Sequence, residues 1–263
     1  MHRGFSLVEL SIVLVILGLL TGGILAGQSL IRAAELRSFS TDTQRYITAI
    51  QTFRDKYFAI PGDMTNAVRF WGAQAGGTAD GPDAACGPAL TAAAAGTATC
   101  NGNGNGNIAA VNAENYETYR SWQHLANAGL IEGSYSGVTA GAANSFSPSI
   151  GVNSPRSRIS NSGFTLVYYA PTTSSADPTY FVSPNGNMFW FGTAAASYTS
   201  APALKPEEAW NIDTKLDDGR PGYGNILSTK SATTCNTNTD PSLSEYQLSL
   251  SGINCSLFIR SRT

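Results

Sequence analysis

A long apolar run near the N-terminus constrains this chain of 263 residues more than any other feature of its sequence. Residues 5–25 contain one charged side chain, that of Glu9, among residues that are mostly Leu, Ile and Val. A transmembrane helix needs about 20 mainly apolar residues, and the run has that length. Arg3 lies just before it and favours an orientation with the N-terminus in the cytoplasm. The sequence therefore predicts a single N-terminal anchor, with the rest of the chain outside the cytoplasm.

Two simpler explanations of the run fit less well. A secretory signal peptide has a shorter apolar core and small residues at positions −3 and −1 before its cleavage site. Cleavage after Ala26 would place Ile24 at position −3, and little positive charge precedes the run. An ordinary transmembrane anchor explains the length of the run but leaves Glu9 without a role.

Glu9 is the most informative residue of the run. A carboxylate in a membrane helix costs about 2–3 kcal/mol at the bilayer centre and less near the interface, so it usually has a partner. No basic residue lies within one helical turn of Glu9. Cleavage after Gly4 would expose the α-amino group of Phe5, four residues earlier. That amine can neutralise Glu9 of its own chain, or Glu9 of a neighbouring copy, where it would also set the axial register.

The segment from Gly4 to Leu10, which reads Gly-Phe-Ser-Leu-Val-Glu-Leu and precedes the apolar run, resembles the cleavage and methylation signature of type IV prepilins and type II secretion pseudopilins. The resemblance covers about the first 30 residues. It implies that prepilin peptidase cuts after Gly4 and that Phe5 becomes the N-methylated first residue. It also implies that Glu9, the fifth residue of the mature chain, is the assembly glutamate.

The resemblance also implies a location and a set of partners. The chain would cross the bacterial inner membrane once, with a cytoplasmic N-terminus and a periplasmic head, and would then enter an envelope or cell-surface filament. Its partners would be other pilin subunits, the prepilin peptidase and methyltransferase, and an inner-membrane assembly platform. The function implied is that of a structural filament subunit. The alternative is a low-abundance minor pilin whose looped head binds a substrate, a surface or DNA.

The helix that begins in the apolar run is expected to continue well beyond it. Pro61 is the first proline of the chain, so one helix can extend to about residue 60. Apolar and aromatic residues recur after residue 28 at spacings of three and four, which places them on one helical face. They are Phe39, Thr43, Tyr46, Ile50, Phe53 and Tyr57. This face is expected to pack on a globular head.

The sequence thus predicts an α+β fold, in which one long helix packs on a small antiparallel sheet with long loops. The expected divisions are a leader (1–4), a transmembrane and assembly half of the helix (5–27), an amphipathic half (28–60) and the head (61–263). The elements expected in the head are a short helix at 64–71 capped by Asp63, a helix at 116–128, strands at 164–169, 180–182 and 188–191 with an Asn185-Gly186 turn between the last two, a helix at 206–216, and a final hairpin of strands 246–250 and 256–259.

The four cysteines form two local pairs in the sequence, Cys86 with Cys100 and Cys235 with Cys255. Four cysteines allow three connectivities, and local pairing is favoured because each pair brackets a single loop. Disulfides would place the head in an oxidising compartment. Four buried free thiols are the alternative.

An acidic group near the end of the expected helix at 206–216 is a candidate metal site. Asp213, Asp217 and Asp218 lie where the helix dipole is unfavourable for negative charge, and Lys215 or Arg220 can neutralise them. Calcium is the other candidate, since major pseudopilins of type II secretion bind calcium in C-terminal loops. No other cofactor is expected. The Asn-Gly repeat at 101–107 partly mimics a calcium loop, but it lacks carboxylates and is interpreted as a turn-rich loop.

Several classes of function lack support in the sequence. Charged residues make up 13% of the chain, the net charge is −2, and no basic stripe is present, so no nucleic-acid partner is predicted. His124 is the one histidine outside the leader, and a lone helical histidine is usually structural. No Gly-rich phosphate loop follows a strand. The chain is therefore not expected to be an enzyme.

Overall fold

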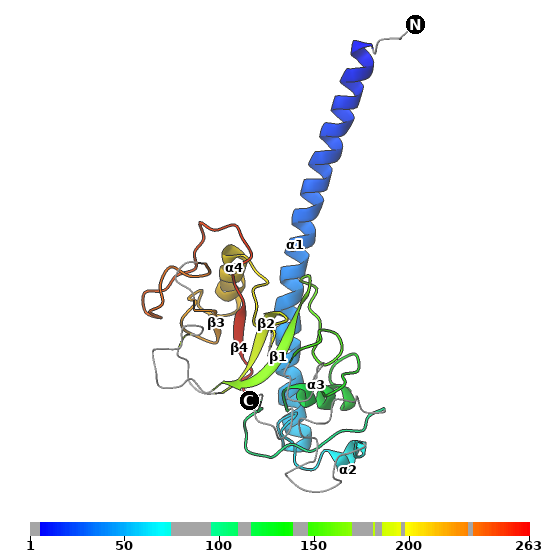
Figure 1. The fold of residues 1–263 in the computed structure, drawn as a ribbon, viewed down its shortest axis with the longest axis vertical. Helices are drawn as coiled ribbons and strands as arrows, with labels where there is room; N and C mark the ends of the chain where they lie inside the picture. Colours follow the sequence, from blue (N-terminus) through cyan, green and yellow to red (C-terminus); the bar gives the residue numbers. More distant parts are fainter. Residues whose placement is uncertain are drawn as a thin grey trace.

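The computed structural model describes residues 6–74, 96–109, 117–138, 147–169, 181, 186–195, 198–230 and 234–263. A single long helix, α1 (Leu7–Tyr57), forms the axis of the molecule. A head with a four-stranded antiparallel sheet lies beside the C-terminal half of α1, and the N-terminal half projects away from it (Figure 1). The α+β arrangement predicted from the sequence is confirmed.

Both ends of α1 have defined caps. At the start, the Ser6 hydroxyl accepts the backbone N–H of Glu9, and the Glu9 carboxylate accepts the N–H of Ser6. At the end, Phe58 adopts a left-handed conformation with φ 53°, and its N–H donates to the carbonyl of Arg54. The helix therefore ends at Tyr57, three residues before the expected end at residue 60. Ile60 precedes Pro61, and a residue that precedes proline is disfavoured in the helical region.

The sheet has the strand order β1-β2-β4-β3, and every neighbouring pair is antiparallel. Its strands are β1 (Ser162–Tyr169), β2 (Gly186–Thr193), β3 (Ile226–Ser228) and β4 (Leu257–Arg260). Phe164 of β1 pairs with Phe191 of β2, and Trp190 of β2 pairs with Phe258 of β4. The last strand of the chain thus lies inside the sheet.

The predicted final hairpin is wrong. Instead of pairing with 246–250, strand β4 pairs with β2 on one side and β3 on the other. Tyr246 forms only an isolated bridge with Asn236. The strands on both sides of β4 contribute buried apolar side chains to the pairing. Leu248, in contrast, is half exposed, so pairing with 246–250 would bury little apolar surface. Phe181, from the predicted strand at 180–182, is not in a strand, and Asn185 of the predicted turn lies outside the described residues.

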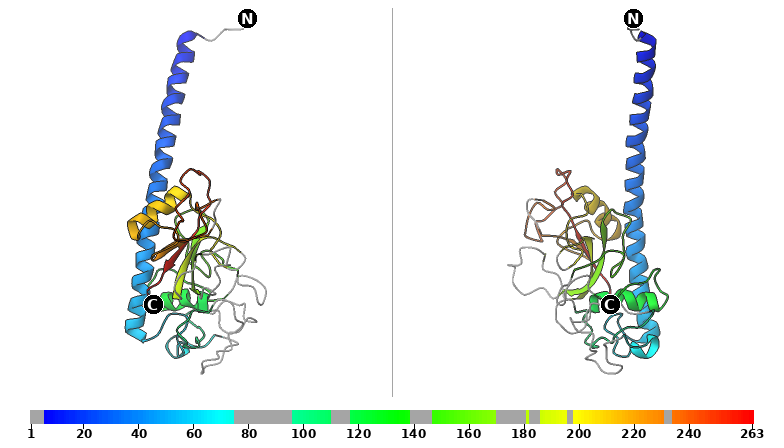
Figure 2. Two further views of the ribbon diagram at one scale, coloured as in Figure 1. Left: turned by 90° about the vertical axis from the view of Figure 1, so that its left-hand side faces the viewer. Right: turned by 45° about the vertical axis from the view of Figure 1, so that its right-hand side comes forward.

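The core lies between α1 and one face of the sheet. Phe39 of α1 meets Phe191 of β2 with ring centroids 4.4 Å apart, and Tyr46 meets Trp122 at 5.0 Å. The predicted stripe is confirmed as the buried face of α1 for all its members except Tyr57, which is half buried. Three short helices complete the head, namely α2 (Val68–Trp71), α3 (Glu117–Asn127) and α4 (Pro206–Leu216). Figure 2 shows α4 at the end of the head nearer the projecting half of α1, and α3 nearer its far end.

The short helix after Pro61 differs from its prediction. Helix α2 covers four residues and begins at Val68, whose N–H is accepted by the side chain of Asn101 at 3.0 Å. Asp63 does not cap this helix. Its carboxylate instead accepts the N–H groups of Gly104, Asn105 and Gly106. The Asn-Gly repeat is therefore wrapped around a carboxylate, with its N–H groups turned inward.

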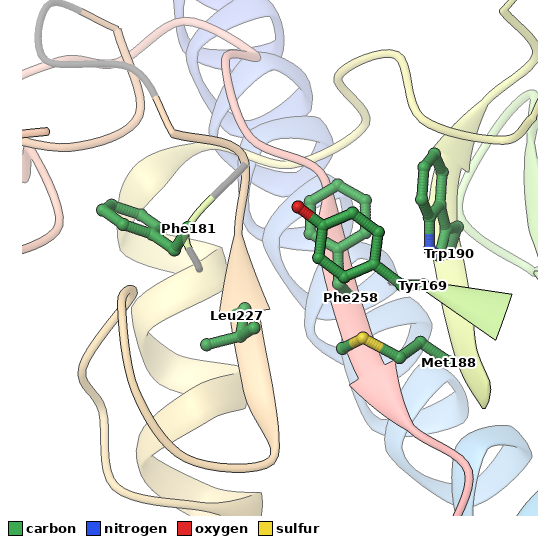
Figure 3. Close-up of a pocket in the computed structure, with 6 residues that line it drawn as sticks. All are labelled: Tyr169, Phe181, Met188, Trp190, Leu227 and Phe258. Carbon is green, nitrogen blue, oxygen red and sulfur yellow. The ribbon is translucent and has the colours of Figure 1, made fainter. Parts of the chain in front are cut away.

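The other face of the sheet carries a second, smaller apolar cluster. Figure 3 shows side chains of all four strands gathered there, together with Phe181. They surround a cavity of about 10 Å³, lined by Tyr169, Phe181, Met188, Trp190, Leu227 and Phe258. That volume accommodates at most one water molecule, so this cluster is a closed part of the core rather than a ligand site.

Candidate functional site

The N-terminal half of α1 is the largest uncovered apolar surface among the described residues. Every large apolar side chain between Leu7 and Ile31 is at least half exposed, and Leu7 is 86% exposed. The first buried residue of the helix is Phe39. Full burial of a large apolar side chain stabilises by about 1.5–3 kcal/mol relative to full exposure, and these side chains lack half or more of that burial. A surface of this extent therefore requires a cover, which is a membrane, other copies of the helix, or both.

Length and composition suit this helix to a membrane. Among the described residues, α1 is the one helix long and apolar enough to cross a bilayer, and its most apolar 18-residue window has no buried residue. A helix satisfies its own backbone hydrogen bonds, which is the requirement for a segment surrounded by lipid.

Glu9 lies on this surface, in the first turn of α1. Its Oε2 atom accepts the N–H of Ser6 at 2.8 Å, and the Ser6 hydroxyl accepts the N–H of Glu9 at 3.3 Å. This reciprocal capping box satisfies two helix-end donors but supplies no positive charge. The carboxylate is therefore held at the N-terminal end of α1 by its own chain and can still pair with a cation. Gly4 and Phe5, the predicted cleavage site, lie outside the described residues.

Four glycines of the same half, Gly18, Gly22, Gly23 and Gly27, have open space around them. Apart from the backbone of the same helical turns, a Cβ atom built on any of these glycines meets no atom within 4 Å. The fold of one subunit therefore does not explain them. They form two pairs with a spacing of four residues, which is the spacing that lets helices approach closely in membranes.

An ion pair that the sequence analysis missed marks the boundary between the two halves of α1. The guanidinium of Arg32 binds Glu208 of α4 through two contacts, Nε to Oε1 at 2.6 Å and Nη2 to Oε2 at 2.7 Å. Arg32 Nη1 also contacts Glu35 at 2.8 Å. Burial alone would raise the pKa of Glu208, but its hydrogen bonds with Arg32 and the backbone of Lys205 outweigh burial and lower that pKa. The pair ties α4, and with it the head, to α1 at the level where the exposed surface ends.

The second expected cysteine bridge is present in the structure. Cys235 and Cys255 form a disulfide that closes a loop of 20 residues, and both are fully buried. Cys255 lies just before β4, and its carbonyl accepts the N–H groups of Ala203 and Leu204. Cys100 is also disulfide-bonded, and its expected partner Cys86 lies outside the described residues. The bridge at Cys235 holds the C-terminal loop against the central strand.

The three acids of the candidate metal site do converge. One oxygen from each of Asp213, Asp217 and Asp218 lies within 4.8 Å of the other two. Among the described residues no ion pair joins them to a cation, so the expected neutralisation by Lys215 or Arg220 is not observed there. Arg220 lies over the ring of Tyr223 instead, 4.9 Å from its centroid.

Hydrogen bonds hold these carboxylates in place. Asp213 accepts the hydroxyl of Tyr246 at 2.8 Å, and Asp217 accepts N–H groups of Asn225 and Ile226. Burial raises the pKa of Asp213 to about 7, and the charges of the two neighbouring acids act in the same direction. Three carboxylates held together without a paired cation fit the oxygen ligands that calcium prefers.

A buried polar cluster on α3 contains Arg120, which the sequence analysis missed, and His124, which it interpreted as structural. Arg120 is fully buried, and its Nη1 donates to the side-chain oxygens of Gln74 at 2.7 Å and Gln123 at 2.9 Å. His124 is fully buried as well, and its Nδ1 accepts the N–H of Gly62 at 3.0 Å. Burial lowers the pKa of Arg120 to about 9 and that of His124 to about 3. The histidine is thus a neutral structural link between α3 and the end of α1.

Comparison with known families identifies the N-terminus. Residues 1–25 match the family model described as the prokaryotic N-terminal methylation motif. No curated protein and no solved structure matches the chain. The chain therefore carries the prepilin-type signature, which confirms the resemblance seen in the sequence. Residues 7–25 of the matched segment belong to the uncovered half of α1.

Proposed function

We propose that this protein is a structural subunit of a type IV pilus-like or type II secretion pseudopilus filament. In this proposal prepilin peptidase cuts between Gly4 and Phe5, and the freed amine is methylated. The mature subunit resides in the bacterial inner membrane with its head in the periplasm until an assembly platform moves it into the filament. The observation that supports this proposal most is the coincidence of the prepilin-type signature with the uncovered half of α1.

Assembly replaces lipid around α1 with other copies of α1. Lipid tails are as apolar as leucine, so helix packing gains little from apolar burial and needs close contact or polar pairing. The open glycine positions give room for close contact. Glu9 supplies the polar pairing, because the amine of Phe5 on a neighbouring copy can bind the carboxylate that the capping box positions.

Replacement of Glu9 tests this mechanism. Glu9→Leu removes the carboxylate but keeps the segment apolar, so the protein should still insert and should be cleaved normally. Filaments recovered by shearing should fall at least tenfold. Glu132→Leu, at an exposed carboxylate of the head, is the matched control and should assemble normally. Wild-type yields from Glu9→Leu, or an N-terminus other than methylated Phe5 in the extracted protein, would refute the proposal.

A low-abundance subunit of the same kind of filament is the second candidate. The Gly-, Ala- and Asn-rich sequence between residues 72 and 160 favours it, because a compact major subunit has less need of such long connections. Such a subunit would use its head to bind a substrate, a surface or DNA. The copy number of this chain relative to other pilins in sheared filaments separates the two.

Calcium binding by Asp213, Asp217 and Asp218 is part of the proposal and has its own test. At a calcium concentration a hundredfold above the dissociation constant, binding stabilises the folded state by about 2.7 kcal/mol. Calcium should therefore raise the melting temperature of the full chain in detergent by several degrees, and magnesium should do so much less. Asp218→Asn should abolish the shift. An equal response of wild type and variant would argue against the site.

A further inference from the structure

Phe58, at the far end of α1 from the exposed half, is the most exposed aromatic side chain among the described residues. It is 94% exposed and has φ 53°. A left-handed conformation costs an L-residue about 1–2 kcal/mol, and glycine or asparagine usually occupies this position after a helix. The fold of one subunit therefore gains neither burial nor favourable backbone geometry from a phenylalanine here.

The surface around Phe58, here called the tip, combines this ring with the carboxylate of Asp55. Asp55 lies three residues earlier on α1, and among the described residues it takes part in no ion pair. The tip borders a hollow of about 550 Å³, lined by Gln51, Arg54, Asp55, Phe58, Ala59 and Ile60. Of the two cations near Asp55, Lys56 lies over the ring of Tyr57, whereas Arg54 borders the same hollow.

A groove that combines apolar side chains with two cations lies between α1 and α4. It has a volume of about 630 Å³, and α1 contributes residues between Ala33 and Thr41 while α4 contributes Asn211 to Leu216. Leu36, Ile212 and Leu216 supply apolar side chains that are buried or half buried. Arg37 and Lys215 supply positive charge, and neither has an ion pair within the described part of the chain.

Two acids of α1 near the groove already have partners, and the three acids at the C-terminal end of α4 beside it, Asp213, Asp217 and Asp218, form the proposed calcium site. Glu35 contacts Arg32 at 2.8 Å, and Asp42 contacts Arg45 at 3.3 Å. The two cations that line the groove are thus the groups of this surface left for an outside carboxylate.

We propose that the tip of one subunit inserts into the α1–α4 groove of another subunit, with Phe58 on the apolar side chains and Asp55 beside Arg37 and Lys215. This inference rests on the proposed filament function and names one contact that builds the filament. Tip and groove lie 17 to 25 residues apart on one continuous helix, so they are separated by about 25–38 Å along its axis.

That separation decides the kind of assembly. A subunit cannot satisfy its own groove, and two copies with parallel helices meet only when one is shifted along the axis by that distance. The pair then retains one open tip and one open groove, which lie on different copies. A contact between different surfaces that does not close on itself generates an open filament.

Cysteine cross-linking tests the contact directly. Ala59→Cys at the tip and Ser40→Cys in the groove keep Phe58 in place, and no native cysteine that the structure describes is a free thiol. Filaments of the double variant should give a ladder of covalent multimers on non-reducing gels. Each single variant should give none. Dimers from Ala59→Cys alone would show tip-to-tip contact and overturn the proposal.

A second variant separates the contact from the fold. Phe58→Gly relieves the backbone conformation, so the subunit should melt at the same or a higher temperature, while the filament yield should fall at least tenfold. Leu243→Ser, at another exposed apolar residue of the head, should leave the yield unchanged. Asp55→Arg should also lower the yield, and Arg37→Asp in the same chain should restore it.

The possible outcomes distinguish the tip-to-groove contact from the filament function. Wild-type filaments without cross-links in the double variant, or with a normal yield from Phe58→Gly, would overturn the tip-to-groove contact and leave the filament function intact. Failure of the wild-type protein to enter filaments would overturn both.

Discussion

The two halves of α1 belong to one continuous helix but have opposite surroundings. Between Leu7 and Ile31 every large apolar side chain is at least half exposed, whereas Phe39, Ile50 and Phe53 are completely buried. The backbone hydrogen bonds are alike in both halves, so secondary structure does not cause the difference. The C-terminal half is fixed by its contacts with the sheet and α3. The N-terminal half has no partner within the described part of the subunit. Its apolar sequence therefore fits an apolar environment outside the subunit, and not the subunit's own core.

The largest expected effect comes from shortening one apolar side chain in each half. Phe39→Ala removes a ring packed against Phe164 and Phe191 and should lower the free energy of unfolding of the head by about 3–5 kcal/mol. Leu17→Ala, at a 51% exposed position, should change it by less than about 0.5 kcal/mol. Denaturant unfolding of the full chain in detergent, followed by near-ultraviolet circular dichroism, measures both. Equal losses would mean that the halves fold as one cooperative unit.

A smaller effect concerns pH and involves only the head. Burial raises the pKa of Glu117 to about 7, so its contribution to stability is present below about pH 4.5 and is lost as pH rises through 7. The pKa of His124 is lowered to about 3, so its contribution is present above about pH 6.5 and is lost as pH falls. The two residues therefore act in opposite directions between pH 7.5 and pH 5.

Two variants reveal these opposite signs. Between pH 7.5 and pH 5 the stability of wild type relative to Glu117→Gln should rise by about 2 kcal/mol, and relative to His124→Gln it should fall by a similar amount. Unfolding midpoints measured across this range give both differences. Leu17→Ala serves as the control and should follow the wild-type profile. Parallel profiles for all variants would contradict the assignment of pH dependence to these buried groups.

The smallest effect lies at the boundary between the halves. A double-mutant cycle with Arg32→Gln and Glu208→Gln should give a coupling of about 1–2 kcal/mol, since the pair is bidentate and partly buried. The same cycle on Arg45 and Asp42, a single and more exposed contact, should give about 0.5 kcal/mol or less. Similar values for the two pairs would mean that Arg32 does not anchor the head to α1.

The parts of the fold that depend on short-range pattern could be predicted from the sequence. The apolar stripe predicted the buried face of α1, and the proline and glutamates at 206–208 predicted α4, which begins and ends at the expected residues. Strand β1 follows from its β-branched and aromatic residues. In each case the signal lies within a few turns of the element itself.

Features that depend on contacts between residues distant in the sequence could not be predicted from local patterns. Asp63 precedes α2 and looked like its cap, but the N–H groups of the Asn-Gly repeat, some 40 residues later, bind it more completely. Arg32 and Glu208 are 176 residues apart, and no local pattern connects them. For the candidate assembly site, Glu9 could be found from its cost in an apolar helix, but the exposure of Phe58 could not. A left-handed residue at the end of a helix is usually predicted from a glycine or asparagine, and a phenylalanine at that position does not indicate one.

The interior place of β4 has a consequence for biosynthesis. Among the described residues, strand β3 joins the sheet only through β4. During synthesis β1 and β2 are made first and can pair, whereas β3 has no partner in the sheet until β4 follows it. The apolar side chains of β3 therefore stay unpaired until the last strand of the sheet has been made. Folding of the sheet is thus expected to finish with the insertion of β4 between β2 and β3.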